Sequence, residues 1–137
     1  MTAQRNRGDR ISGNTKLQGR WGEAQAARYL TGLGYKIVAA GYRTRFGEID
    51  LIAENGKYLA FVEVKMRKSD KFAAGREYVD RRKQARLIAT AQLWLTENPS
   101  PLQPRFDVAE IYAPDGMRTK AGDLHIEYIE NAFEVTH

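Results

Sequence analysis

The amino-acid sequence has 137 residues, no cysteine and only two histidines, His125 and His137. The absence of cysteine excludes disulfides, thiol catalysis, cysteine-ligated zinc and iron–sulfur clusters. Two imidazoles also exclude a multi-histidine metal site. The longest stretch without a charge, the ten residues from Leu87 to Thr96, is too short to span a bilayer. No apolar run follows the N-terminal arginines, so they do not form a secretory signal. We therefore predict a soluble cytoplasmic protein with no membrane partner.

The net charge of +5 is distributed unevenly along the chain. Residues 1–20 carry five basic residues against one acid, and residues 65–86 carry nine against three. Residues 107–137 instead carry seven acids against two basic residues. Segregated positive charge is typical of proteins that bind a polyanion, most often nucleic acid. A solvated basic surface without such a partner has the same composition, so charge alone leaves both interpretations open.

A chain of this length predicts one domain. Apolar periodicity, glycines and prolines predict the order α-β-β-β-α-β-β after a flexible basic tail at residues 1–16. The expected helices span Leu17–Leu33 and Val79–Leu95, and the expected strands span Tyr35–Ala40, Gly47–Glu54, Tyr58–Met66, Arg105–Tyr112 and, at an edge, Leu124–Ile129. Ser69–Tyr78 is expected to be a mobile loop. The order predicts an α/β (α+β) fold for residues 17–137, with a central mixed sheet flanked by helices.

Acidic side chains gather in two of the expected strands, at Gly47–Ala53 and Phe61–Lys65. Because strand side chains alternate between faces, Glu63 and Lys65 share one face, and so do Glu48 and Asp50. The other face is expected to be the core side, formed by Ile49, Leu51, Val62 and Val64.

A two-residue turn at Asn55–Gly56 sets the expected register of these strands, because this dipeptide is a strong hairpin signal. Counting back from the turn places Asp50 opposite Phe61. Glu48 then faces Glu63, and Asp50 lies diagonally across from that acid, within side-chain reach.

This acidic patch has two explanations. One is a solvent-facing sheet surface with a cross-strand salt bridge, which fits poorly because like charges directly opposite each other are destabilising. The other is a bound cation that relieves the repulsion, and hard oxygen ligands suit Mg²⁺ or Mn²⁺. Lys65, on the same side, could then steady a developing phosphate charge or an attacking water. The pattern favours the second explanation.

Glu23 falls inside the apolar stripe of the first helix, which is formed by Ala26, Ala27, Leu30 and Leu33. A carboxylate that faces the sheet from this position needs a cation, a lysine or a hydrogen-bond donor, because unpaired burial is costly. An equally good explanation places Glu23 at the end of the stripe, where the first turn of a helix favours an acid.

The start of the second helix is strongly basic. Four basic residues surround Gln84, namely Arg81, Arg82, Lys83 and Arg86. A phosphate-contacting face beside the acidic patch and the solvated half of an amphipathic helix both explain this pattern. In the strand that follows, Arg105 and Asp107 share a face, and we expect a structural ion pair there rather than catalysis.

These motifs resemble those of the bacterial YraN family, whose members are regarded as candidate endonucleases. The resemblance covers residues from about 17 to 133 and rests on Gly22–Glu23, Gly47–Ala53, Phe61–Lys65 with Arg67, Lys83–Gln84 and Arg105–Val108. That family is similar to archaeal Holliday-junction resolvases and to the wider PD-(D/E)XK nuclease superfamily. The resemblance implies the superfamily's restriction-endonuclease-like fold, a mixed sheet flanked by helices. Ile49 departs from the pattern, because it stands where the motif has a proline, but that proline is dispensable in the superfamily.

The resemblance also implies four catalytic residues. Asp50 matches the motif aspartate, Glu63 and Lys65 match the E-x-K element, and Glu23 matches the helix-one glutamate of the resolvase-like branch. Asp50 and Glu63, with a backbone carbonyl near Val64, would bind Mg²⁺ or Mn²⁺. Glu23 would hold the ion through water or help to hold a second one. Lys65 would position and polarise the attacking water.

The leading hypothesis is therefore a metal-dependent endonuclease that hydrolyses DNA, including branched, junction-like DNA. Contacts to nucleic acid are expected from Arg20, Arg67, Lys68, Arg81, Arg82, Lys83, Gln84 and Arg86. Resolvases act as dimers, so the resemblance implies a homodimer. Two alternatives remain: a non-catalytic nucleic-acid-binding module that retains the nuclease fold, and an interaction subunit whose basic faces meet an acidic protein.

Overall fold

The computed structural model describes residues 7–68 and 80–133, and the expected loop at Ser69–Tyr78 lies outside them. The helices and strands follow the predicted order: α1 (Arg7–Gly32), β1 (Lys36–Thr44), β2 (Gly47–Glu54), β3 (Tyr58–Arg67), α2 (Arg81–Glu97), β4 (Gln103–Tyr112) and β5 (His125–Ile129). Two short 3-10 turns, η3 (Gly116–Arg118) and η4 (Ala121–Asp123), join β4 to β5. The predicted α+β fold with a single sheet is therefore confirmed.

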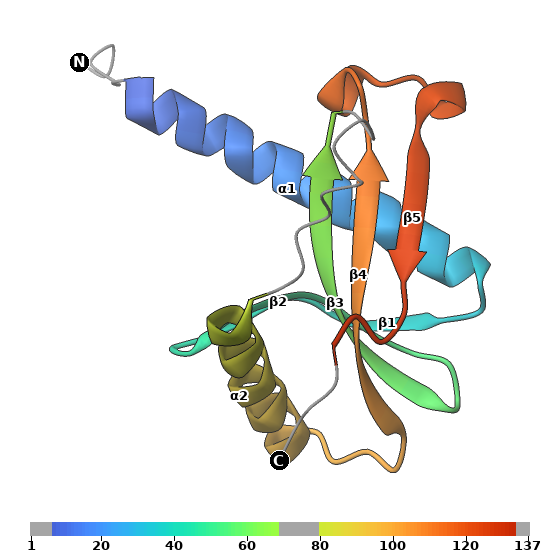
Figure 1. Ribbon diagram of the computed structural model, residues 1–137. Coiled ribbons are helices and arrows are strands. Elements are labelled where there is room, and N and C mark those ends of the chain that lie inside the picture. The colour runs from blue at the N-terminus through green and yellow to red at the C-terminus, as the bar shows by residue number, and fades with distance from the viewer. Residues whose placement is uncertain (1–6, 69–79, 134–137) are drawn as a thin grey trace.

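The five strands form one sheet in the order β1-β2-β3-β4-β5 (Figure 1). Neighbours are antiparallel except for β3 and β4, which run parallel. A parallel pair needs a long crossover connection, and α2 lies in the segment that joins these two strands. The sheet is therefore mixed, as predicted, and β5 lies at an edge, as predicted.

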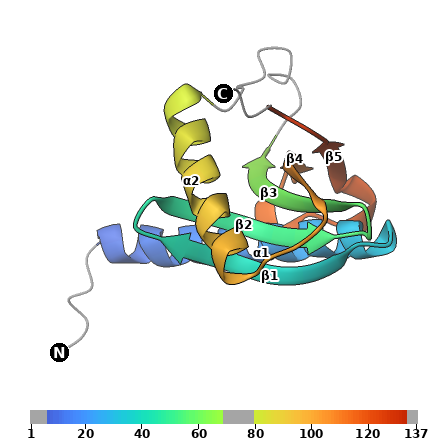
Figure 2. The ribbon, with the colours of Figure 1, turned by 90° about the horizontal axis from the view of Figure 1, so that it is seen from below.

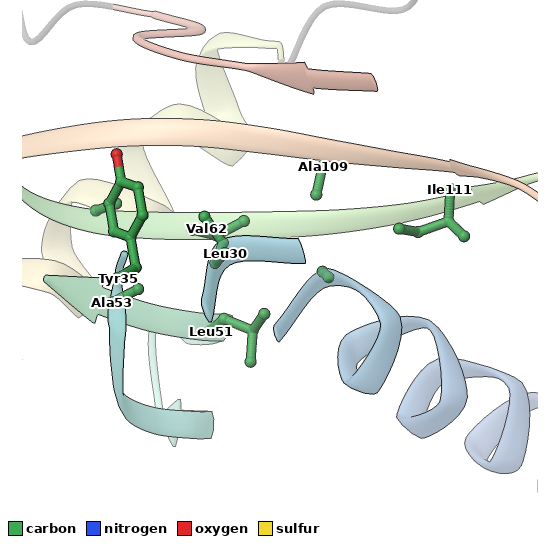
Figure 3. Close-up of a cluster of buried hydrophobic side chains, with 9 residues drawn as sticks. Leu30, Tyr35, Leu51, Ala53, Val62, Ala109 and Ile111 are labelled. Atoms are coloured by element: carbon green, nitrogen blue, oxygen red, sulfur yellow. The ribbon is translucent and has the colours of Figure 1, made fainter. Parts of the chain in front are cut away.

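The two helices pack on opposite faces of the sheet (Figure 2). Ala26 and Leu30 of α1 lie in one buried cluster with Leu51 and Val62. Figure 3 shows the side chains of Leu30, Leu51 and Val62 close to one another. The second cluster combines Leu87 and Ala91 of α2 with strand residues, including Ile49, Ile52, Phe61 and Phe106. Each face of the sheet thus has its own apolar core, which we call the α1 side and the α2 side.

The helix α1 begins at Arg7, well before the predicted start at Leu17, so residues 7–16, predicted as part of the tail, are helical. The reason is visible in Figure 1, where the N-terminal part of α1 projects beyond the sheet. Helical turns with no surface to cover need no apolar stripe, and periodicity cannot detect them. No helix in the described part of the chain combines the length and hydropathy needed to cross a lipid bilayer.

The β2–β3 turn is one residue further along than predicted. Gly56, with φ +89°, and Lys57 are its central residues, and the backbone N–H of Asn55 donates to the carbonyl of Tyr58. The side-chain oxygen of Asn55 accepts from the N–H groups of Lys57 and Tyr58, at 3.0 and 2.8 Å. Asparagine thus serves as the turn's side-chain acceptor rather than as a central residue with positive φ.

This turn changes the register between β2 and β3. The pairs run from Glu54–Leu59 to Leu51–Val62, so the expected pairings of Asp50 with Phe61 and of Glu48 with Glu63 are wrong. One step beyond the last pair, Asp50 is level with Glu63. The shift therefore places these two acids directly across from each other rather than diagonally.

Arg105 and Asp107 form the structural ion pair that the sequence predicted. The guanidinium donates to both Asp107 oxygens over 2.9–3.1 Å, and both residues are buried. Tyr128 donates its hydroxyl to Asp107, and the N–H of Asn131 does the same at 2.9 Å. Arg105 also donates to the hydroxyl of Tyr35. A buried charge pair with this many hydrogen bonds ties β4 to the chain before β1 and after β5.

Candidate metal and nucleic-acid site

The strands β1 and β2 break their alternation at the same position. Ile49 lies in the α2-side core and Leu51 in the α1-side core, although residues two apart in a regular strand share a face. Between the pairs Ala40–Leu51 and Tyr42–Ile49, Gly41 is level with Asp50 and has φ +65°. Glycine adopts this conformation without the strain that a side chain brings. The predicted core face that included Ile49 is therefore wrong, because the backbone turns over at Gly41 and Asp50.

The carboxylate of Asp50 reaches across to β3. Its Oδ2 accepts a hydrogen bond of 2.8 Å from the backbone N–H of Val64, beyond the last paired position of the two strands. Burial raises the pKa of Asp50 to about 6, the hydrogen bond from Val64 lowers it, and the charges of Glu63 and Glu48 raise it. Asp50 is thus fixed to the main chain of the E-x-K segment and lies within electrostatic range of Glu63.

Glu63 points toward α2, on the same face as Phe61 of the α2-side core. Its Oε1 forms an ion pair with the ammonium group of Lys83 in the first turn of α2. Only 12% of the Glu63 side chain is exposed. Its Oε2 is buried and has no hydrogen-bond partner among the described residues. A buried carboxylate oxygen without a partner is costly, and it is the kind of atom that a cation would satisfy.

Glu23 lies on the α1 side of the same acidic group, as predicted by the first of the two explanations. Burial raises the pKa of Glu23 to about 7, the charges of Asp50 and Glu48 raise it further, and Arg20 lowers it. Gly22, just before it, allows α1 to approach the sheet, because a Cβ there would lie 2.8 Å from the sulfur of Met66. The absence of a side chain at residue 22 thus lets α1 lie close against Met66 of β3, in the turn that carries Glu23.

A further buried acid, Glu110, was not predicted. It is level with Lys65 across the parallel β3–β4 pair and is only 1% exposed. Arg67 donates from Nε to its Oε2 at 3.1 Å, and Tyr112 donates to its Oε1 at 3.2 Å. The signal in the sequence was an acid inside the apolar run of β4. Arg67, predicted to contact nucleic acid, thus has a structural partner on β4.

The other predicted contacts to nucleic acid lie on two helices and at one strand end. Arg20, Lys68, Arg81, Arg82 and Arg86 are all exposed. Gln84 is half-buried and precedes the buried Leu87 by one helical turn. Lys83 instead contacts Glu63. The structure therefore brings Lys83 into the acidic site and leaves the neighbouring arginines of α2 facing solvent.

The donor set fits a hard divalent cation bound by two carboxylates and main chain. No group of three or more acidic or histidine side chains is arranged to hold a metal in the part of the chain that the structure describes. Asp50 is held beside Glu63, and the buried Oε2 of Glu63 lacks a partner. Oxygen ligands of this type suit Mg²⁺, which commonly binds through one or two carboxylates and retains several waters.

The sequence profile of the uncharacterised protein family UPF0102 matches residues 22–111. The chain belongs to this family. A UPF0102 protein of Symbiobacterium thermophilum is 44% identical over 117 residues, which cover 84% of this chain and 94% of that protein. A UPF0102 protein of Chlorobium chlorochromatii is 42% identical over 85% of this chain and 91% of its own length. A third, from Parafrankia sp., is 40% identical, with coverages of 84% and 94%.

Membership of the family that the sequence motifs indicated is therefore confirmed. The matched segment contains all four predicted catalytic residues, Glu23, Asp50, Glu63 and Lys65. It begins at Gly22, the point at which α1 comes against β3.

Proposed function

We propose that this UPF0102 protein is a metal-dependent endonuclease that hydrolyses phosphodiester bonds in DNA. The observation that carries the proposal is the placement of Asp50. Its carboxylate is anchored by the N–H of Val64 and is level with Glu63, whose buried Oε2 lacks a partner. A pair of acids held together, in which Asp50 has a raised pKa and Glu63 has a buried oxygen without a partner, is typical of a cation site in a nuclease rather than of a stabilising surface.

Each residue has a chemical task in this proposal. Asp50 and Glu63 would hold Mg²⁺ or Mn²⁺ with the Val64 carbonyl, and Glu23 would act through water from the α1 side. When bound, the ion would lower the pKa of its water and offset charge on the scissile phosphate. Lys65 shares the face of Glu63, from which its ammonium group would orient the attacking water.

The exposed arginines of α2 support a polyanionic substrate. Arg81, Arg82 and Arg86 lie on the helix whose first turn contacts Glu63 through Lys83. Cations in this position can hold the phosphate backbone beside the acids without reading base sequence. The family resemblance adds branched DNA as a substrate and a homodimer as the acting form, since resolvases cut two strands.

One observation favours the alternative, a nucleic-acid-binding module without catalysis. Lys83 already supplies a positive charge to Glu63. A lysine that permanently neutralised this acid would leave a basic, inert surface on the nuclease fold. The two functions differ in whether a divalent cation produces turnover.

The test is incubation of the protein with labelled duplex, single-stranded and four-way-junction DNA in Mg²⁺, Mn²⁺ or EDTA. We expect cation-dependent cleavage that is lost in Asp50→Ala, Glu63→Ala and Lys65→Ala. Glu54→Gln, at the far end of the same hairpin, is the matched control and should cut like the wild type. Binding without cleavage in every cation would favour the module. Cleavage that persists in all three variants would indicate a contaminating nuclease.

A further inference from the structure

The turn between β1 and β2 presents an aromatic ring and arginines at the surface. Thr44 and Gly47 form the last ladder pair, so Arg45 and Phe46 are its two central residues. Phe46 is 37% exposed, and the guanidinium carbon of Arg45 lies 4.9 Å from the centre of its ring. Arg43, one residue before the turn, is exposed and pairs with Glu48 at 3.5 Å.

This turn is held firmly against α2. The N–H of Phe46 donates to the hydroxyl of Thr44 at 3.1 Å, which fixes the backbone that carries the ring. The hydroxyls of Thr44 and the fully buried Thr90 are 3.4 Å apart, within hydrogen-bond distance. A Cβ on Gly47 would already be in contact with Arg86 and Thr90. In Figures 1 and 2 the turn accordingly lies beside α2. The exposed ring is thus carried by an ordered support.

The position of the turn relates it to the acidic site. Phe46, at the turn that leads into β2, precedes Asp50 by four residues, a length of at most about 13 Å at the usual rise of a strand. That length corresponds to about four nucleotides along a DNA strand whose bases are stacked. The exposed Arg86 lies on the side of α2 that meets the turn. A nucleic-acid strand with one phosphate at Asp50 could therefore pass over the ring of Phe46, between the cationic side chains of Arg45 and Arg86.

We propose that Phe46, backed by Arg45, is a stacking platform for an unpaired base of the nucleic acid that the site acts on. A single exposed apolar residue is ordinary on a protein surface. Phe46 differs because the guanidinium of Arg45 lies over its ring, because its backbone is anchored and because it precedes Asp50 by only four residues. Aromatic rings stack on any base, and arginine adds a cation–π contribution. A base inside a duplex has no free face, so the platform would select DNA with single-stranded character.

This inference rests on the proposed nucleic-acid substrate but does not require cleavage, so its test is a binding measurement in EDTA. Fluorescence anisotropy would compare a labelled dT oligonucleotide with a blunt duplex of equal length. We expect Phe46→Ala and Phe46→Leu to weaken single-strand binding by about 5- to 150-fold, the contribution of one stacked base. Duplex binding should change less than twofold. Leu retains apolar area without a π face, so it separates stacking from simple burial.

Two further variants sharpen the comparison. Phe46→Trp should retain single-strand affinity, and the emission of the new indole should be quenched by the oligonucleotide. Leu93→Ala, which truncates another exposed apolar side chain, should affect neither probe. Unchanged single-strand affinity in Phe46→Ala, an equal loss on duplex, or a wild type that binds neither probe would overturn the proposal. A wild type that shows the Phe46 effect but never cuts would overturn only the endonuclease.

Discussion

Asp50 accepts a hydrogen bond from the backbone N–H of Val64 at the point where β2 and β3 stop pairing. The carboxylate takes the place that a strand carbonyl would occupy in a regular ladder. Its position is consequently determined by the main chain of β3 rather than by a rotamer in solvent. The same bond joins the first acid of the site to the segment that carries Glu63 and Lys65.

Two substitutions of Asp50 should therefore affect stability differently while both abolish activity. Asp50→Ala leaves the N–H of Val64 without an acceptor and should lower the free energy of unfolding by about 1–3 kcal/mol. Asp50→Asn retains an oxygen acceptor and removes a charge whose burial is unfavourable, so urea denaturation at pH 8 should show little loss or a gain. Both variants should lack metal-dependent cleavage. Equal destabilisation by Ala and Asn would mean that the hydrogen bond contributes little.

The raised pKa values of Glu23 and Asp50 predict that stability falls as pH rises. Burial and neighbouring acids raise the pKa of Glu23 from 4.5 to about 7 and that of Asp50 from 3.8 to about 6. The folded state therefore binds these protons more tightly than the unfolded state. The stabilisation is complete below pH 4 and is lost as pH passes through the range from 6 to 7.

Urea denaturation from pH 5 to pH 8 measures this dependence. We expect the free energy of unfolding to fall by about 1–2 kcal/mol more in the wild type than in a Glu23→Gln, Asp50→Asn variant, after allowance for solvent screening of the half-buried Glu23. The double variant is the control because it has every other titrating group of the wild type. Parallel pH profiles of the two proteins would contradict the assignment of these acids.

Removing Lys83 should strengthen divalent metal binding. Its ammonium group pairs with Glu63, so a metal must compete with it for that oxygen. In Lys83→Met the competitor is gone, and Mn²⁺ affinity measured by electron paramagnetic resonance should rise about five- to tenfold. Arg82→Met, an adjacent exposed cation, should leave the affinity nearly unchanged. Weaker Mn²⁺ binding in Lys83→Met would show that the lysine supports the site instead.

Asp107 should matter for folding rather than for chemistry. Replacing it by alanine leaves the buried Arg105 without its main partner and should cost about 3–5 kcal/mol in the free energy of unfolding. Cleavage per folded molecule should remain. Circular dichroism with denaturant gives the stability, and activity is normalised to the folded fraction. A folded Asp107→Asn protein without cleavage would place this residue in the mechanism.

Local patterns were sufficient to predict the order of elements and the shared face of Glu63 and Lys65, because alternation in β3 is regular. They failed at Asp50, where the face depends on the backbone of Gly41 in a neighbouring strand. The register also failed, because Asn55 acts through its side chain rather than as a central turn residue. The face of Asp50 and the β2–β3 register were both predicted wrongly, because each depends on contacts that regular strand alternation does not include.

Contacts between distant segments were beyond sequence reasoning for a different reason. Nothing local indicates that Lys83, among several basic residues of α2, is the one that meets Glu63. The burial of Glu110 likewise depends on β3, which supplies Arg67. The types of residue in the sequence were enough to predict a group of acids. The basic residues that pair with Glu63 and Glu110 could be identified only from the folded structure.

The acidic site combines the β2–β3 hairpin with Lys83 of α2, and these two parts differ in how much chain must be ordered to bring them together. Asp50 and Val64 belong to one hairpin, a local structure that forms within microseconds. Lys83 reaches Glu63 only when α2 docks on the sheet, at a greater entropic cost of loop closure. An early hairpin would hold its two acids together without their lysine, and their repulsion would oppose its closure. Docking of α2 should thus be the step that commits the hairpin to its final form, and mutations at Lys83 should slow folding as well as shift equilibrium stability.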